Sequence, residues 1–192
     1  MGREIELKFR ADGEKIAAIR DKFGEFTAIS METAYYDTAQ GMLSRLHWTL
    51  RRRYENGVSV CTLKTPAPDG NRGEWETYAP TVEEAIAALV EAGAPEELSA
   101  LAAEGLVLSC GARFTRLAKN LCVAGARLEL ALDRGVLLGG GRELPFAEVE
   151  AELKEGSEEA LRAFAGTLAT EFSLEEETLS KHARAVRLAA GE

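Results

Sequence analysis

Residues 48–65 read WTLRRRYENGVSVCTLKT and predict a β-hairpin. Asn56-Gly57 is the dipeptide most typical of a two-residue hairpin turn, because both of its positions tolerate a positive φ. The turn joins two predicted strands at 48–55 and 58–65, both rich in strand-forming residues. The hairpin therefore predicts antiparallel pairing in this part of the chain.

Charged side chains of the hairpin follow the period of a strand. Successive side chains point to opposite faces, so Arg51 and Arg53 share one face while Arg52 points the other way. On the return strand, Thr62 and Lys64 share a face. One face of the hairpin is therefore expected to be cationic.

The rest of the chain alternates between strand and helix patterns. Strands are predicted at about 3–10, 26–38, 73–79, 105–116, 119–124, 126–134 and 146–154. Helices are predicted at about 12–23, 82–92 and 157–172, with a short helix after residue 95 and a helical or extended tail near 181–184. Residues 139–141 are three glycines, and we expect a turn there. Because strands outnumber helices and tight turns join most of them, we predict an α+β fold with an antiparallel sheet or barrel.

Ionic residues of both signs occupy one face of several predicted strands, while the opposite face is apolar. Four groups show this alternation: Glu4, Glu6 and Lys8; Arg72, Glu74 and Glu76; Glu129 and Asp133; Glu148, Glu150 and Glu152. A closed barrel with a polar lumen and helices packed on the outside accommodates this pattern and removes exposed sheet edges. An antiparallel sheet with a solvated charged face is the simpler alternative.

The combination of charges in such a lumen predicts a ligand. Arg and Lys suit phosphate oxygens, whereas carboxylates repel them unless a hard cation lies between. Mg²⁺ and Mn²⁺ are held by carboxylates together with substrate phosphates. Acids and bases in one channel therefore predict a polyphosphate site with a divalent metal ion.

Overall composition limits the function classes. The chain has 192 residues, 32 of them acidic and 23 basic, with a formal net charge of −9. This length predicts a single domain over residues 1–192. The charge argues against general nucleic-acid or anionic-membrane binding, because both need a basic surface. Acidic runs at 83–84, 158–159 and 175–177 are expected on the solvated surface.

Location and assembly are expected from simple features. We see no apolar leader or membrane span, and three cysteines without a CxxC pair indicate reduced thiols, so a cytoplasmic location is expected. Only two histidines are present, which argues against a His-rich metal site. A homodimer is the common default for soluble oligomers.

At this point the motifs resemble a known family. Glu4-Ile5-Glu6-Leu7-Lys8 is similar to the ExExK signature of the CYTH superfamily, the triphosphate tunnel metalloenzymes. The agreement continues in chain order through Leu50-Arg51-Arg52-Arg53, Leu63-Lys64, Arg72-Gly73-Glu74, Phe114-Thr115-Arg116, Leu130-Ala131-Leu132-Asp133 and Glu148-Val149-Glu150. The tail Leu179-Ser180-Lys181 with Arg184 resembles the bacterial inorganic triphosphatase branch.

The resemblance implies a fold, a reaction and a set of site residues. The implied fold is a closed eight-stranded antiparallel barrel that forms a tunnel. The implied reaction is hydrolysis of a small triphosphate, with inorganic tripolyphosphate giving diphosphate and phosphate, assisted by Mg²⁺ or Mn²⁺. The implied metal ligands are Glu4, Glu6, Glu148 and Glu150, with Asp133 as a further candidate. The implied substrate-binding residues are Lys8, Arg51, Arg53, Lys64, Arg72, Arg116, Lys181 and Arg184. The implied catalytic group is Glu4, Glu6 and Lys8.

Three other functions stay open at this stage. A class IV adenylate cyclase would use the same phosphate and metal residues but needs a nucleoside pocket, and no adenine-reading set is recognisable. A thiamine triphosphatase would need an aromatic stacking surface, which Trp48, Trp75 and Tyr78 could form unless they simply pack in a core. A non-catalytic polyphosphate- or nucleotide-binding module would show metal-dependent binding without turnover.

Overall fold

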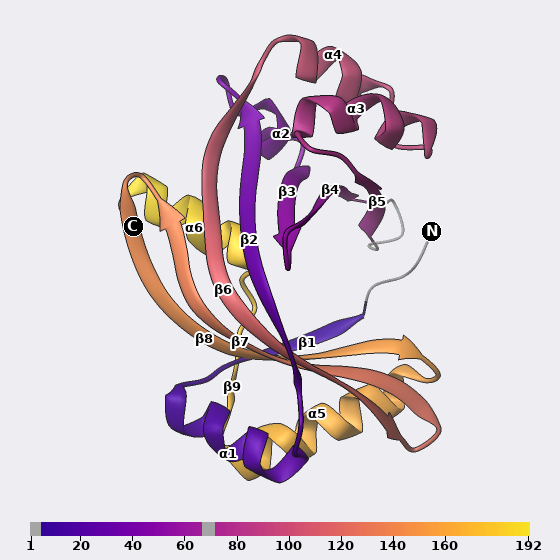
Figure 1. The fold of residues 1–192 in the computed structure, drawn as a ribbon, viewed down its shortest axis with the longest axis vertical. Helices are drawn as coiled ribbons and strands as arrows, with labels where there is room; N and C mark the ends of the chain where they lie inside the picture. The colour runs from indigo at the N-terminus through magenta and orange to yellow at the C-terminus, as the bar shows by residue number, and fades with distance from the viewer. Residues whose placement is uncertain (1–4, 67–71) are drawn as a thin grey trace.

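A nine-stranded antiparallel sheet and six helices make up the computed structural model, which describes residues 5–66 and 72–192 (Figure 1). The strands are β1 (Glu6–Arg10), β2 (Thr27–Thr38), β3 (Thr49–Glu55), β4 (Val58–Pro66), β5 (Arg72–Tyr78), β6 (Leu106–Val123), β7 (Ala126–Gly139), β8 (Arg142–Glu155) and β9 (Glu175–Glu176). The helices are α1 (Gly13–Phe23), α2 (Met42–Arg45), α3 (Val82–Glu91), α4 (Glu97–Ala103), α5 (Glu158–Phe172) and α6 (Lys181–Ala190).

Sheet topology confirms the antiparallel prediction but not closure. The strand order is β5-β4-β3-β2-β6-β7-β8-β1-β9, and every pairing is antiparallel. The expected closed eight-stranded barrel is not found among the described residues, because β5 and β9 end the sheet without pairing to each other. The ninth strand is β9, a two-residue segment that pairs with the end of β1. The α+β class is as predicted.

The hairpin predicted at residues 48–65 forms as expected. β3 and β4 pair across Asn56 and Gly57, whose φ values of 50° and 87° suit the two-residue turn. At the three glycines, Gly140 and Gly141 form the expected turn between β7 and β8, while Gly139 is the last residue of β7. By contrast, β6 is one continuous strand where two were predicted, and β7 and β8 are longer than expected. Each of these strands pairs along its length with a long neighbouring strand, and this pairing extends it beyond the residues whose own pattern is typical of a strand.

Helices α1 and α5 cover the outward face of β1, β7 and β8 at one end of the molecule (Figure 1). Asp12 and Ser157 cap these helices by accepting hydrogen bonds from backbone N–H groups of the first turn. Ile19 of α1 and Leu161 of α5 pack into a core with Val149, all three fully buried. This arrangement confirms the expected apolar outer face.

Helices α3 and α4 cover the outward face of β3 and β4 at the other end. Leu50 and Leu63 of the hairpin pack there against Leu89 and Leu98. The short helix α2 was not predicted, since four residues show no period. Its first turn is held by the buried carboxylate of Asp37, which accepts from the N–H of Leu43 at 2.8 Å and from the N–H of Ser44 at 3.1 Å.

Helix α6 lies against the inner face of the sheet, which the sequence prediction of outer helices missed. Ala185 of α6 packs in one core with Phe114 and Phe146. These two phenylalanines have the same strand parity as Arg116 and Glu148, so α6 covers the same face that carries the charges. The helix therefore brings its own first turn to the charged part of that face.

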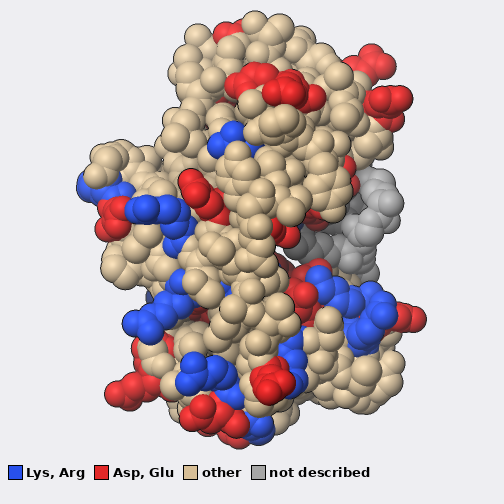
Figure 2. Space-filling model, in the orientation of Figure 1, with Lys and Arg blue, Asp and Glu red and all other residues tan. Residues whose placement is uncertain are grey.

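The positions of acidic side chains and of two cysteines can be compared with the sequence predictions. In Figure 2, acidic side chains lie on the upper part of the molecule, around α3 and α4. The surface prediction for the acidic run at 175–177 was only partly correct, because Glu177 is buried while its two neighbours are exposed.

Cys61 and Cys110 are buried, and burial raises the pKa of the Cys61 thiol to about 11. In the described part of the chain, no helix is both long and apolar enough to cross a membrane.

Gly139, the last residue of β7, allows α6 to lie close to the backbone of the sheet. A Cβ added at Gly139 would lie 2.5 Å from the carbonyl oxygen of Ala185 and 2.8 Å from the backbone nitrogen of Ala189. We expect Gly139→Ala to lower the free energy of unfolding by about 1–3 kcal/mol in urea denaturation, through overpacking. The control is Gly166→Ala in α5, where no atom lies within 4 Å. This substitution should stabilise by about 0.5–1 kcal/mol. Wild-type stability of Gly139→Ala would contradict the docking of α6.

Candidate active site

Three neighbouring strands place acidic side chains directly beside one another on the inner face. Glu6 of β1 pairs with Glu152 of β8, which in turn pairs with Glu129 of β7. Further along the same strands, Asp133 pairs with Glu148. Like charges at directly paired positions destabilise a sheet. This face therefore requires cations among its carboxylates.

A buried group of three carboxylates forms the deepest part of the face. Asp133 and Glu148 are completely buried, and Glu150 is 8% exposed. One oxygen from each lies within 4.8 Å of the others. We call Asp133, Glu148 and Glu150 the carboxylate trio. Without compensation, each such charge removed from water would cost several kcal/mol.

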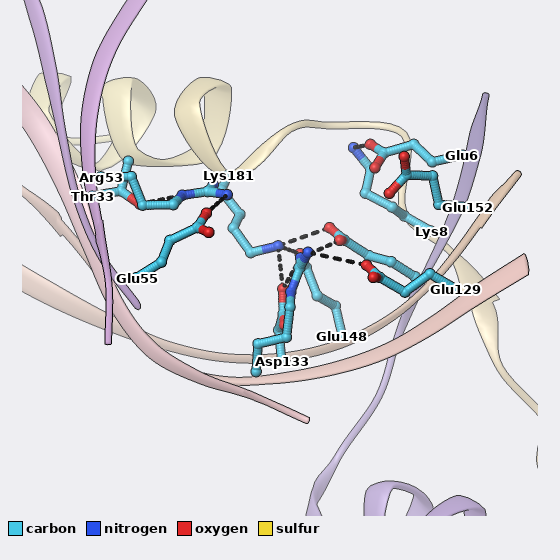
Figure 3. Close-up of polar contacts among 12 residues, drawn as sticks. Glu6, Lys8, Thr33, Arg53, Glu55, Glu129, Asp133, Glu148, Glu152 and Lys181 are labelled. Atoms are coloured by element: carbon cyan, nitrogen blue, oxygen red, sulfur yellow. Dashed lines mark hydrogen bonds and ion pairs between the residues drawn. The ribbon is translucent and has the colours of Figure 1, made fainter. Parts of the chain in front are cut away.

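Lys181, the first residue of α6, reaches into the trio (Figure 3). Its Nζ lies 2.7 Å from Asp133 Oδ2 and 2.8 Å from Glu150 Oε1, and it also donates a hydrogen bond to Glu148. Ser180 caps the helix by accepting a 3.1 Å hydrogen bond from the N–H of Ala183. The capped first turn thus presents one ammonium group to all three carboxylates.

Two arginines complete the charge balance of the trio. Arg116 of β6 makes a two-donor contact with Asp133, with both hydrogen bonds at 2.8 Å, and also pairs with Glu150. Arg184, one turn after Lys181, pairs with Glu148. Three cationic side chains therefore contact the three carboxylates of the trio.

The pKa values follow from this arrangement. Burial alone would lower the pKa of Lys181, but Glu150, Asp133 and Glu148 raise it above its usual value. Burial alone would raise the pKa of Glu150, but Lys181 and Arg116 hold it well below its usual range. Lys181 and Glu150 therefore stay ionised at neutral pH, whereas burial raises the pKa of Glu148 above its usual value.

A cationic wall faces the trio from the hairpin strands. It contains Arg51 and Arg53 of β3 and Lys64 of β4. Arg53 donates a 3.0 Å hydrogen bond to Thr33, and burial together with the charge of Arg51 lowers its pKa to about 10. Lys64 lies 3.2 Å from Glu74. Among the described residues Arg51 has no ion-pair partner, and its Nε is buried without a hydrogen-bond partner.

A cavity of about 670 Å³ lies between the cationic wall and the acidic strands. Figure 2 shows acidic and basic side chains around a hollow between the upper and lower parts of the molecule. At one end of the cavity, Lys8 lies 3.4 Å from Glu6 (Figure 3). Glu152 lies 2.7 Å from Lys154, which does not line the cavity. The cavity thus has basic and acidic walls within one volume.

Most of the predicted site residues come together here. Those that line the cavity are Glu6, Lys8, Arg51, Arg53, Lys64, Arg116, Glu150 and Lys181. Asp133 and Glu148 lie just behind the lining, in contact with the lining residue Lys181. Arg184 does not line the cavity and pairs with Glu148. Glu4 lies outside the described residues, and for Arg72 only the backbone, at the start of β5, is described. The metal-binding and substrate-binding roles of these residues stay predictions.

The sequence interpretation missed several residues at the site. Tyr35 and His182 line the cavity with their ring centroids 4.7 Å apart. Strand parity could have placed Tyr35 on this face, because it pairs directly with Arg51. His182 could not be placed without knowing where α6 docks. Glu129 was recognised on the acidic face but not as a site residue, although it lies 3.9 Å from Arg116.

The trio has the donor chemistry of a divalent-metal site. Carboxylate oxygens are the ligands that Mg²⁺ and Mn²⁺ prefer, and three of them converge here. The ammonium of Lys181 shows that the position accepts a cation. The residues therefore fit a metal ion, which would compete with Lys181 for the same oxygens.

Comparison with known proteins identifies the family. The profile of the CYTH domain matches residues 2–186. The chain belongs to the CYTH domain family. An inorganic triphosphatase from Haemophilus influenzae is 26% identical over 191 residues, covering 96% of this CYTH chain and 54% of the relative. The chain thus spans about half the length of that relative.

Solved structures support the CYTH fold. The Hippeastrum protein HpAC1, assigned as an adenylyl cyclase and described as having a dominant triphosphatase activity, matches with a TM-score of 0.67 and 21% identity. That match covers 100% of this chain and 97% of HpAC1. A protein from Pyrococcus horikoshii matches with a TM-score of 0.62 and 20% identity, covering 96% of this chain and 99% of that protein.

Competition between Lys181 and a metal ion can be tested on stability alone. Lys181→Met removes the ammonium and leaves buried carboxylates without compensation, so the free energy of unfolding should fall by about 3–5 kcal/mol without divalent ions. Added Mn²⁺ should then stabilise the variant more than it stabilises the wild type, in parallel urea denaturations. Equal stabilisation of both proteins by Mn²⁺ would contradict metal binding at the trio.

Proposed function

We propose that this CYTH protein is a metal-dependent triphosphatase that hydrolyses inorganic tripolyphosphate to diphosphate and phosphate. The observation that carries the proposal is one cavity lined by both basic and acidic side chains. Its basic residues are Lys8, Arg51, Arg53, Lys64, Arg116, Arg162 and Lys181, and its acidic residues are Glu6, Glu150, Glu152 and Glu158. A cationic wall alone would suit many anions. The added carboxylates favour a phosphate chain bridged by a divalent cation.

The cationic wall would bind and orient the phosphate chain. Arg51 and Arg53 can each contact a phosphate group with two donors, while Lys64 acts as a point charge. Arg51 is the best placed, because its buried Nε has no protein partner within the described residues. Fixing the chain in this way supplies most of what phosphoryl transfer requires, namely positioning and charge neutralisation.

The acidic wall would hold the metal ion and accept a proton. The residues that would bind Mg²⁺ or Mn²⁺ are Asp133, Glu148 and Glu150 of the trio, with Glu6 and Glu4 from the first strand. When bound, the ion would neutralise phosphate charge and lower the pKa of a water ligand. A carboxylate of the cavity wall would accept the proton of the attacking water. Lys181, once displaced from the trio, would turn its ammonium to the phosphate chain.

Aromatic residues bear on the choice of substrate. Trp48 and Trp75 pack against the core beneath α3, and Tyr78 does not line the cavity. The stacking surface that thiamine triphosphate would need is therefore not supplied by these three. Within the described residues, the aromatic lining of the cavity is Tyr35 and His182, which contact each other. The names of relatives support triphosphate hydrolysis, and also keep adenylate cyclase as the rival.

A substrate panel tests the proposal directly. Purified protein is incubated with tripolyphosphate, ATP or thiamine triphosphate, with Mg²⁺, Mn²⁺ or a chelator, and products are quantified. We expect equal amounts of phosphate and diphosphate from tripolyphosphate, and only with metal ion present. Cyclic AMP and diphosphate from ATP would instead indicate a cyclase. Binding of all three without turnover would indicate a non-catalytic module.

Neighbouring arginines of β3 provide a matched pair of variants. Arg51→Ala should raise the KM for tripolyphosphate about 10- to 100-fold, the equivalent of losing charged hydrogen bonds. Arg52→Ala is the control, because Arg52 lies on the opposite face, over the ring of Tyr54 and bonded to the carbonyl of Pro80. Its kinetic constants should match those of the wild type. Equal effects of the two substitutions would contradict the cationic wall.

A further inference from the structure

A buried carboxylate outside the cavity lining is unexplained by the proposed function. Glu177 follows β9 and is 3% exposed, whereas Glu175 and Glu176 are exposed. Burial of a carboxylate is unfavourable unless cations and hydrogen-bond donors compensate it. The partners of Glu177 therefore indicate what its burial achieves.

Glu177 ties three separate parts of the chain together. Its backbone N–H donates a 2.8 Å hydrogen bond to the carbonyl of Lys8 in β1. Its Oε2 accepts a 2.9 Å hydrogen bond from Arg10 Nε, and its Oε1 accepts one of 2.9 Å from the N–H of Leu179. The same Oε2 lies 3.7 Å from Arg184 Nη1.

These contacts lead directly to the site. Leu179 precedes Ser180 and Lys181, so the hydrogen bond from its N–H fixes the turn that enters α6. Arg184 lies one helical turn later and pairs with both Glu148 and Glu177. Glu177 therefore contacts Arg184 and the turn that precedes Lys181, the two residues of α6 whose cationic side chains pair with the trio.

Arg10 does not by itself explain the burial of Glu177. The side chain of Arg10 is 62% exposed, so water can solvate its guanidinium. The side chain of Arg184 is only 15% exposed, and its Nε is buried without a hydrogen-bond partner in the described part of the chain. Arg184 is thus the partner whose orientation depends on a fixed carboxylate.

We propose that Glu177 is a positioning residue that holds Arg184 against the carboxylate trio and orients the first turn of α6, which lines the phosphate-binding cavity. The proposal rests on the proposed function of that cavity. Glu177 does not itself line the cavity, but its backbone N–H and its carboxylate contact two residues that do, Lys8 and Leu179. Its carboxylate would act through Arg184 and the turn at Leu179. Partners one step behind functional side chains typically change affinity or activity 10- to 100-fold when removed.

The test is a double-mutant cycle with Glu177→Gln and Arg184→Ala. Glu177→Gln removes the charge but keeps an oxygen that can accept from Leu179. Its kcat/KM for tripolyphosphate should fall about 10-fold, mainly through KM, because a binding contact is weakened. In the Arg184→Ala background the same substitution should have little further effect. The matched control is Glu176→Gln, an exposed neighbour in β9, which should leave kcat/KM unchanged.

The cycle is also run on the dissociation constant of tripolyphosphate, measured by calorimetry without metal ion. Wild-type binding of tripolyphosphate, together with no phosphate release when Mg²⁺ or Mn²⁺ is supplied, would contradict the hydrolase proposal, and the role of Glu177 would then be judged on binding alone. Thermal unfolding of each variant separates folding from positioning. If Glu177→Gln does not fold, Glu177→Asp replaces it in the cycle, since it keeps the charge and shifts it by one methylene.

Non-additivity between positions 177 and 184 supports the proposal. A loss in Glu177→Gln that persists undiminished in the Arg184→Ala background overturns it, because the effect would then be general to the fold. Wild-type affinity and kcat/KM in Glu177→Gln overturn it as well.

Discussion

The carboxylate trio and the cations that enter it form the constraint on which this structure depends. Asp133 and Glu148 are completely buried on neighbouring strands, where they would repel each other and lose hydration. Lys181 and two arginines compensate these carboxylates through direct ion pairs. Since Lys181 comes from the C-terminal helix, the charged face of the sheet is complete only when the end of the chain has docked.

This requirement explains the unusual position of α6. The helix lies on the inner face, beside Phe114 and Phe146, where it shares that face with the charged residues. Its close approach needs Gly139, because any side chain there would meet the helix backbone. The cluster also explains how an acidic protein of net charge −9 can offer a cationic cavity. Many acids lie on the surface, while others share ion pairs with inward-facing Lys181, Arg116 and Arg184.

Prediction from the sequence pattern was correct where the alternation within a single strand decides on which face a side chain lies. Parity alone separated Arg51 and Arg53, which line the cavity, from Arg52, which contacts Tyr54 on the other face. The prediction was wrong where contacts with residues distant in sequence decide whether a side chain is buried. Glu177 lies in an acidic run typical of a solvated surface, yet it is buried, bonded to the carbonyl of Lys8 in β1 and paired with Arg184. Likewise, closure of the sheet was expected from charge pattern and family resemblance, and the described strands do not close.

The sequence by itself determined the antiparallel hairpin, the apolar and ionic faces and the CYTH family, because turn chemistry and two-residue alternation are local properties. Tertiary structure alone decided which charges meet. Lys181 is more than thirty residues from Glu148 along the chain, and no local pattern shows that its ammonium reaches that carboxylate. The compensation of buried charge depends on distances between segments. Those distances exist only once helix α6 has packed onto the sheet.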